Sequence, residues 1–138
     1  MSAQVISKRS GFSLVELVVV VLVMGIIAAV AGPKMFDTAG NARTSSTKQS
    51  LSVLRSAIEL SRAQNGTYPA DKAAIEALLQ GPFPAAEVAT SLTSSQRIDV
   101  NVVTAGTALA VDTTPAHGWK YDSTTGEIIV NQAAYATW

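Results

Sequence analysis

One carboxylate stands at the head of the longest apolar run of this 138-residue sequence. Glu16 is followed by residues 17–31, in which no side chain is charged or polar. A carboxylate within a membrane helix costs roughly 2.5–3.5 kcal/mol on insertion scales, so a retained one usually has a function. The chemistry open to Glu16 is pairing with a positive charge, and the surrounding elements decide which charge that is.

The apolar run that contains Glu16 has the length of a membrane span. Residues 12–31 would form a helix of about 30 Å, which matches the hydrocarbon thickness of a bilayer. Lys8 and Arg9 precede it, and such charges hold that end in the cytoplasm. Two interpretations compete: a secretory signal peptide that ends at Ala31, or a retained membrane helix. Glu16 and the helical pattern beyond the run favour the retained helix.

The helical pattern continues past a weak region. Pro33 removes a backbone donor and clashes with the preceding turn, so residues 32–40 are expected to be locally melted or bent. Apolar residues then recur at three- and four-residue spacing between residues 42 and 64, with charged residues on the opposite face. Asn65 and Gly66 end this amphipathic helix, because Gly favours a left-handed cap.

The rest of the chain predicts a short helix and several strands. Asp71 is the expected N-cap of a helix over residues 72–80. Alternating or apolar patterns predict strands over residues 98–102, 108–111, 119–121 and 127–130, and the last two form a hairpin turned by Gly126. Residues 85–96 and 131–138 give no clear pattern. The predicted fold is α+β: a long N-terminal helix packed on a small antiparallel sheet of three to four strands.

Composition and motifs argue against catalysis and nucleic-acid binding. The sequence has no cysteine, so disulfides and thiol chemistry are excluded, and His117 is its single histidine. No phosphate-binding glycine loop is present. The formal net charge is zero, and basic residues are not interleaved with aromatic ones, so no nucleic acid is indicated. We therefore predict a protein that is not an enzyme, and we expect Trp119 to lie in the core.

The segment Lys8–Glu16 resembles the cleavage signature of type IV prepilins and type II secretion pseudopilins. It combines a basic leader, Gly11, Phe12, a glutamate four residues later and a long apolar helix with Pro33 near its end. Residues 65–69 and the helix after them are similar to the same stretch of major pseudopilins. The resemblance implies that a prepilin peptidase recognises Lys8 and Arg9, cuts between Gly11 and Phe12, and methylates the new Phe12 amine.

The resemblance also implies an assembly mechanism. Glu16 of an incoming subunit would meet the Phe12 amine of a neighbour, and Phe12, Glu16 and Pro33 are the expected assembly residues. The expected partners are further copies in a helical filament, the prepilin peptidase, an inner-membrane assembly platform, minor pilins or pseudopilins, and membrane lipid before assembly. The expected location is the bacterial inner membrane, with the leader in the cytoplasm and the head outside, and then a periplasmic or extracellular filament.

The resulting organisation has four parts: a leader removed on processing (1–11), a transmembrane assembly helix (12–31), its amphipathic continuation (32–66) and a globular head (67–138). The leading function is a major-pseudopilin-like filament subunit of a type II secretion system. A type IV pilin for adhesion, motility or DNA uptake is one alternative, and a secreted soluble binding domain is another. A single-pass membrane enzyme would need a catalytic set, which we do not find. No cofactor is expected, and the candidates for calcium are Asp112 and Asp122, whose spacing matches no calcium loop.

Overall fold

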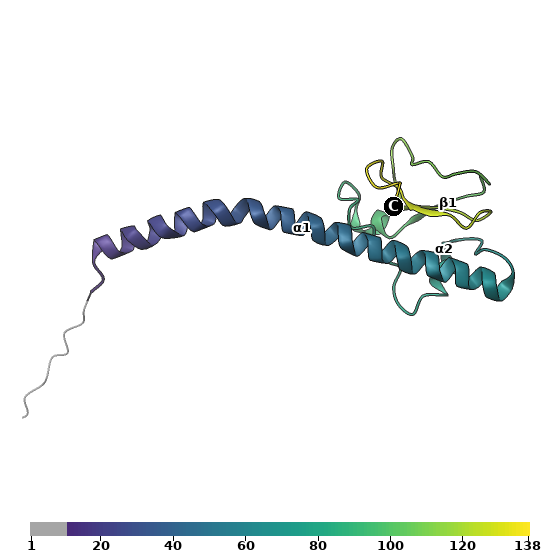
Figure 1. Ribbon diagram of the computed structural model, residues 1–138, viewed down its shortest axis with the longest axis horizontal. Coiled ribbons are helices and arrows are strands. Elements are labelled where there is room, and N and C mark those ends of the chain that lie inside the picture. The colour runs from purple at the N-terminus through teal and green to yellow at the C-terminus, as the bar shows by residue number, and fades with distance from the viewer. Residues whose placement is uncertain (1–10) are drawn as a thin grey trace, which may run out of the picture. The chain divides into compact units, whose positions relative to one another are not determined.

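The computed structural model describes residues 11–138 (Figure 1). The chain divides into two units, one that ends at Ala39 and one that comprises Gly40–Trp138. The predicted processing residues Lys8 and Arg9, and the leader as far as residue 10, lie outside the described residues. The order of elements is α1 (Leu14–Asn65), α2 (Lys72–Glu76), α3 (Ser94–Arg97), β1 (Val100–Val103), β2 (Trp119–Asp122) and β3 (Ile128–Val130).

Helix α1 is continuous from Leu14 to Asn65, with Pro33 in its interior. Of the two states expected for residues 32–40, melted or bent, the melted one is therefore not adopted. Proline removes one hydrogen bond of the ladder, and the bonds of the neighbouring turns persist. One turn later the Thr38 hydroxyl donates to the Lys34 carbonyl at 2.9 Å. The C-terminal end is as predicted, because Gly66 has a positive φ of 76° and its N–H donates to the Arg62 carbonyl at 2.8 Å.

The short helices lie where local signals place them. The Asp71 carboxylate accepts the Ala74 N–H at 2.8 Å, which confirms the predicted N-cap of α2. Helix α2 ends at Glu76, earlier than the predicted residue 80, and turns follow it. Helix α3 lies at the end of the segment that gave no clear pattern. Thr93 and Gln96 form a capping box there, in which each side chain bonds to the other residue's backbone N–H.

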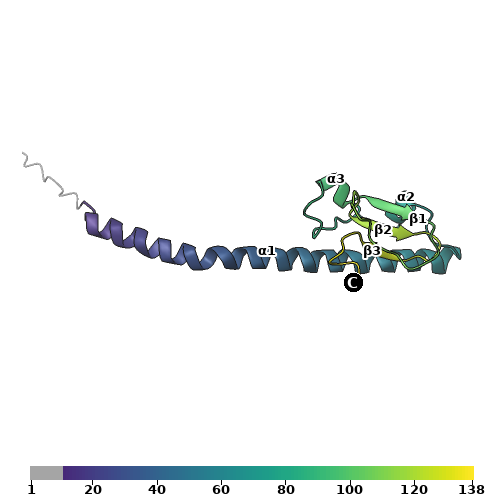
Figure 2. The same cartoon turned by 90° about the horizontal axis from the view of Figure 1, so that it is seen from above.

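The sheet has three strands in the order β1-β2-β3, and it is mixed (Figure 2). Strands β2 and β3 form the predicted antiparallel hairpin, with Tyr121 opposite Ile128 and Gly126 at a φ of 77°. Strand β1 pairs with β2 in parallel, Val100 opposite Trp119, so the prediction of a wholly antiparallel sheet is wrong for this pair. A parallel pair needs a crossover connection rather than a tight turn, and residues 104–118 supply it.

The predicted strand over residues 108–111 is also wrong, because this segment belongs to the crossover loop. Its backbone groups bond to side chains instead of to a neighbouring strand. The Leu109 N–H donates to the Glu127 carboxylate at 3.1 Å, and the Ala110 carbonyl accepts from the Lys120 ammonium at 2.8 Å. An alternating pattern shows that a segment has two faces, but it does not show that a strand edge is free to pair.

The core of the unit Gly40–Trp138 joins one face of α1 to the sheet. Fully or almost fully buried apolar residues come from α1, α2 and the strands: Leu51, Leu54, Ile58, Ile75, Trp119, Tyr121, Ile128 and Val130. Polar tips of the buried aromatic residues find partners. Trp119 Nε1 donates to the Pro84 carbonyl and the Tyr121 hydroxyl donates to the Pro69 carbonyl, each at 2.9 Å. Burial raises the pKa of Tyr121 to about 12.

Candidate functional site

The start of α1 holds Glu16, and the residues of the predicted cleavage position lie just before it. Ser13 precedes the first helical residue, and its Oγ accepts the Val15 N–H at 3.3 Å. The Glu16 carboxylate reaches back and accepts the Ser13 N–H at 2.9 Å. Ser13 and Glu16 thus form a reciprocal cap in which the helix start satisfies its own donors. The signal for this cap is the Ser-x-x-Glu spacing, from which the cap was not predicted.

The environment of Glu16 leaves its negative charge available. Glu16 is exposed, and it takes part in none of the ion pairs found among residues 11–138. The cap satisfies one lone pair of one carboxylate oxygen, whereas a carboxylate has about four acceptor positions. The Glu16 carboxylate can therefore keep the cap and still accept a second donor from outside the chain.

The apolar side chains that follow Glu16 are left unburied by the part of the chain that the structure describes. All large residues from Leu17 to Val30 are about half exposed or more, from 48% for Val23 to 72% for Val30. The helix contains an 18-residue window with a mean hydropathy of 3.0, none of which is buried, so α1 is long and apolar enough to cross a membrane. Such a surface is stable only against lipid or against other apolar helices.

The predicted cleavage position is accessible. Phe12 is 87% exposed, and Gly11 lies before the first helical residue. A Cβ added to Gly11 would meet nothing within 4 Å, so folding of this chain does not require glycine there. A requirement for Gly11 would then come from an enzyme that handles the peptide. Pro33, the third predicted assembly residue, is exposed and lies inside the helix, 17 positions after Glu16.

The structure does not bring the two calcium candidates together as ligands of one site. Asp112 Oδ1 contacts the Lys120 ammonium at 2.7 Å, and this hydrogen bond is the main reason why the pKa of Asp112 falls to about 2. Asp122 is buried and accepts the N–H groups of Gly106 and Thr124, each at 2.8 Å. Burial raises the pKa of Asp122, but these hydrogen bonds outweigh it and the net pKa is lowered. Among residues 11–138, no group of three or more His, Asp or Glu residues is arranged to hold a metal.

A histidine–carboxylate pair in the head was not predicted from the sequence. His117 places its Nδ1 2.9 Å from Asp99 Oδ2, and Lys72 Nζ lies 3.7 Å from Asp99 Oδ1. Burial raises the pKa of Asp99. The hydrogen bond with His117 and the nearby charges have the larger, opposite effect, so the net pKa of Asp99 is lowered. The residues come from separate segments, so their spacing in the sequence gave no signal. These contacts join three separate segments of the head, which fits a structural role.

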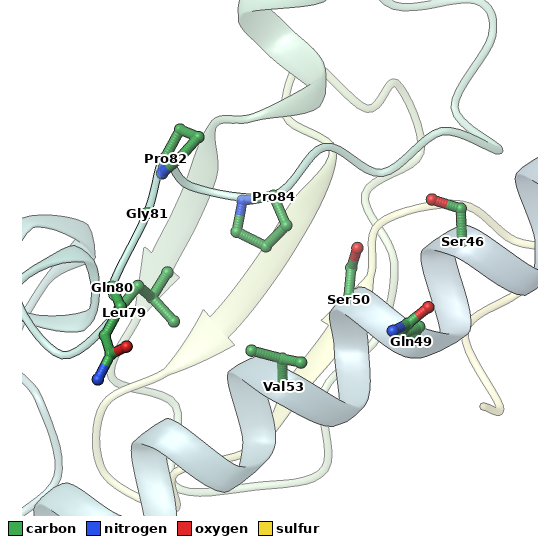
Figure 3. Close-up of a pocket in the computed structure, with 9 residues that line it drawn as sticks. All are labelled: Ser46, Gln49, Ser50, Val53, Leu79, Gln80, Gly81, Pro82 and Pro84. Carbon is green, nitrogen blue, oxygen red and sulfur yellow. The ribbon is translucent and has the colours of Figure 1, made fainter.

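A groove of about 390 Å³ lies on the unit Gly40–Trp138, between α1 and the loop of residues 79–84 (Figure 3). Ser46, Gln49, Ser50 and Val53 line it from the helix. None of its lining residues is acidic, basic or histidine, so this groove offers no general acid or base.

Comparison with known proteins gives two family matches along the chain. Residues 6–32 match the family described as prokaryotic N-terminal methylation motif, and residues 34–99 match the family described as type II secretion system protein G. The first match covers Gly11, Phe12 and Glu16, and the second covers the amphipathic part of α1 and the segments as far as α3.

Several curated proteins are similar to the chain, and all of those compared below carry the name type II secretion system core protein G. The protein of Pseudomonas aeruginosa is 31% identical over 75 residues, which cover 54% of this chain and 53% of that protein. The Aeromonas hydrophila protein is 28% identical over 80 residues, 58% and 56% of the two chains. The Vibrio cholerae protein is 29% identical over 75 residues, 54% and 51%. The chain thus spans about half the length of the curated relatives it matches, and no solved structure matches it.

Proposed function

Because this chain belongs to the family of type IV pilins and type II secretion pseudopilins, we propose that it is a major-pseudopilin-like subunit of a type II secretion filament. The role is structural rather than enzymatic. The observation that carries the proposal is the start of α1, where an exposed carboxylate that forms no ion pair with any of residues 11–138 heads an apolar segment that the described residues leave unburied. The relatives named protein G favour the secretion filament over a pilus.

Processing would create a cation with which Glu16 can pair. Cleavage between Gly11 and Phe12 by a prepilin peptidase leaves a free amine on Phe12, which is positive at neutral pH and which the peptidase then methylates. The amine and the Glu16 carboxylate are each costly in an apolar environment, and pairing them offsets much of that cost. If Glu16 of one subunit pairs with Phe12 of its neighbour, the pair fixes the axial stagger between two helices.

The exposed apolar helix explains how a subunit changes environment. Before assembly the segment from Leu17 to Val30 would lie in the inner membrane, with the leader in the cytoplasm and the head outside. In the filament the same side chains would contact neighbouring helices. Lipid and helix surfaces are about equally apolar, so the transfer changes little hydrophobic free energy. Direction and register then depend on the charge pair, and on contacts with an assembly platform and with minor pseudopilins.

The helix cap gives Glu16 a second role, which an experiment must separate from charge pairing. Glutamine at this position can make the same capping hydrogen bond but carries no charge. Valine removes both the bond and the charge. Ser13→Ala removes the other half of the cap and leaves the carboxylate in place. The three variants Glu16→Gln, Glu16→Val and Ser13→Ala therefore form a matched set.

We expect Glu16→Gln and Glu16→Val to be inserted and cleaved normally. Because both variants lack the charge, we expect their yield of sheared filaments to fall at least about 10-fold, which corresponds to about 1.4 kcal/mol. We expect Ser13→Ala to assemble within a few-fold of the wild type, because it leaves the charge intact. Filament yield would be measured by immunoblot of sheared fractions, and cleavage by the mass of the mature chain. Normal assembly of Glu16→Gln together with failure of Ser13→Ala would show that capping, and not charge, is the function of Glu16.

N-terminal sequencing separates the filament subunit from a secreted soluble domain. A mature chain that begins at methylated Phe12 supports the filament subunit. A mature chain that begins at Gly32 would mean that the apolar segment is a discarded signal peptide, and it would overturn the proposal.

A further inference from the structure

The crossover loop of residues 104–118 has no regular structure, yet side chains of the β2–β3 region make hydrogen bonds to its backbone at several positions. Asp122 accepts the Gly106 N–H at 2.8 Å, and Glu127 accepts the Leu109 N–H at 3.1 Å. Asn131 Oδ1 accepts the Asp112 N–H at 2.9 Å, and Lys120 donates to the Ala110 carbonyl at 2.8 Å. A long loop of this kind is ordered only if such bonds compensate for its conformational entropy.

Lys120 and Asp112 form the centre of this arrangement. The Lys120 ammonium lies 2.7 Å from Asp112 Oδ1 and 2.8 Å from the Ala110 carbonyl oxygen, so one cation binds a carboxylate and a backbone oxygen of the loop. The two side chains are only 14% and 26% exposed. The short, partly buried contact distinguishes this ion pair from the Lys72–Asp99 pair of the same unit, which is longer and more exposed.

The donors around Asp112 exclude a metal ion from the same place. Asp112 Oδ2 accepts hydrogen bonds from Asn101 Nδ2 at 2.9 Å and from Asn131 Nδ2 at 2.8 Å, while Oδ1 accepts from the Lys120 ammonium. The orientation of Asn131 is fixed by its other partners, because its Oδ1 accepts a backbone N–H and its Nδ2 also donates to the His117 carbonyl. Three N–H donors therefore point at the two carboxylate oxygens, whereas calcium needs six to eight oxygen ligands at about 2.3–2.6 Å.

We propose that the Lys120 ammonium is the cation that stabilises this loop, so that the head is stable without calcium. The ammonium occupies the position that a divalent metal would need in order to bind both Asp112 and the Ala110 carbonyl. The second calcium candidate does not change this conclusion, because both oxygens of Asp122 accept backbone N–H groups within a buried turn. The proposal concerns the fold of the head and does not depend on the filament function.

The direct test adds and removes the metal with the full-length wild-type chain in detergent. Thermal unfolding would be followed by the near-ultraviolet circular dichroism of the buried Trp119. We expect melting temperatures in millimolar calcium and in excess EDTA to agree within about 1 °C. Calcium at about 100 times the dissociation constant of a native site would instead raise the melting temperature by about 10 °C or more. Such a rise, with saturable binding in calorimetry, would overturn the proposal.

A matched pair of variants tests the role of the ammonium itself. Lys120→Met keeps the aliphatic stem, removes the charge and leaves Asp112 without its cation, so we expect the melting temperature to fall by about 5 °C or more. Lys72→Met makes the same chemical change at the more exposed pair, and we expect a fall of at most about 2 °C. Equal, small effects of the two variants would show that Lys120 does not fasten the loop. The wild-type metal titration remains decisive even if Lys120→Met fails to fold.

Discussion

The two units of the chain differ in whether their apolar side chains are exposed or buried. In the unit that ends at Ala39, the side chains of the described residues stay largely exposed, and Phe12, Val30 and Phe36 are more than 70% exposed. In the unit Gly40–Trp138, Leu54, Ile58 and Trp119 are completely buried. The hydrophobic effect acts on both, but only the second unit satisfies it within one chain.

The difference shows which part of the molecule depends on its surroundings. The stability of the head is encoded in its own contacts, and a substitution there should be measurable on the isolated protein. The apolar segment of residues 17–30 is not buried by any of the residues that the structure describes, so a substitution there should be silent in unfolding and visible only in a membrane or an assembly. The predictions below test this division, from the largest expected effect to the smallest.

The largest effect is expected at the centre of the head. Trp119→Ala removes a fully buried side chain and its hydrogen bond to Pro84, and it should lower the free energy of unfolding by about 3–5 kcal/mol. Phe36→Ala removes an aromatic residue that is 81% exposed in the other unit, and it should change the unfolding of the head by less than about 0.5 kcal/mol. Urea unfolding in detergent measures both. A comparable loss in Phe36→Ala would mean that the two units do not behave independently.

A glycine substitution tests how tightly the head constrains its backbone. Gly126 has a φ of 77°, and a Cβ there would overlap the Tyr68 ring. Gly126→Ala should therefore cost about 2–3 kcal/mol, the sum of a left-handed backbone and a displaced ring.

Gly66 is the matched control, because its φ is 76° and a Cβ would meet nothing within 4 Å. Gly66→Ala should cost only the backbone part, about 1–2 kcal/mol. The counterpart in the other unit is Gly25→Ala, in a helix interior with open space, which should not destabilise the head. Equal losses at Gly126 and Gly66 would rule out a contribution from the Tyr68 contact.

A valine pair makes the same chemical change in the two units. Val130→Ala removes a fully buried side chain from β3 and should cost about 2 kcal/mol of unfolding free energy. Val20→Ala acts on a side chain that is 53% exposed in the apolar helix and should be silent in the same assay. If both variants change the free energy of unfolding equally, the difference in burial between the units does not contribute to stability.

The smallest effect is expected from pH. The folded-state pKa of Asp112 is lowered to about 2 from the usual 3.8, so the stability that it contributes is present above pH 4 and is lost as pH falls toward 2. Asp112→Asn removes this titration, and the wild type should lose about 1 kcal/mol more than the variant between pH 5 and pH 2, after allowance for the exposed part of the pair. Parallel pH profiles of the two proteins would contradict the assignment.

The elements that were predicted correctly depend on residues close together in the sequence. The Asp71 cap of α2, the Gly66 end of α1 and the β2–β3 hairpin at Gly126 are all decided within about five residues. The candidate site residues Gly11, Phe12 and Glu16 were likewise named from a short local motif, and their processing and assembly roles remain predictions. The capping role of Glu16 was equally local, and the Ser-x-x-Glu signal was present in the sequence.

The sequence by itself determined an apolar membrane-length helix with one carboxylate at its head, because periodicity and composition are properties of neighbouring residues. Only the tertiary structure decided that β1 pairs with β2 in parallel, that residues 108–111 form a loop, and that Lys120 meets Asp112. An alternating pattern tells which side chains share a face, but not the direction of the neighbouring strand. Contacts between distant segments depend on which tertiary arrangement buries the most apolar surface while satisfying every buried polar group. A local sequence pattern does not contain that information.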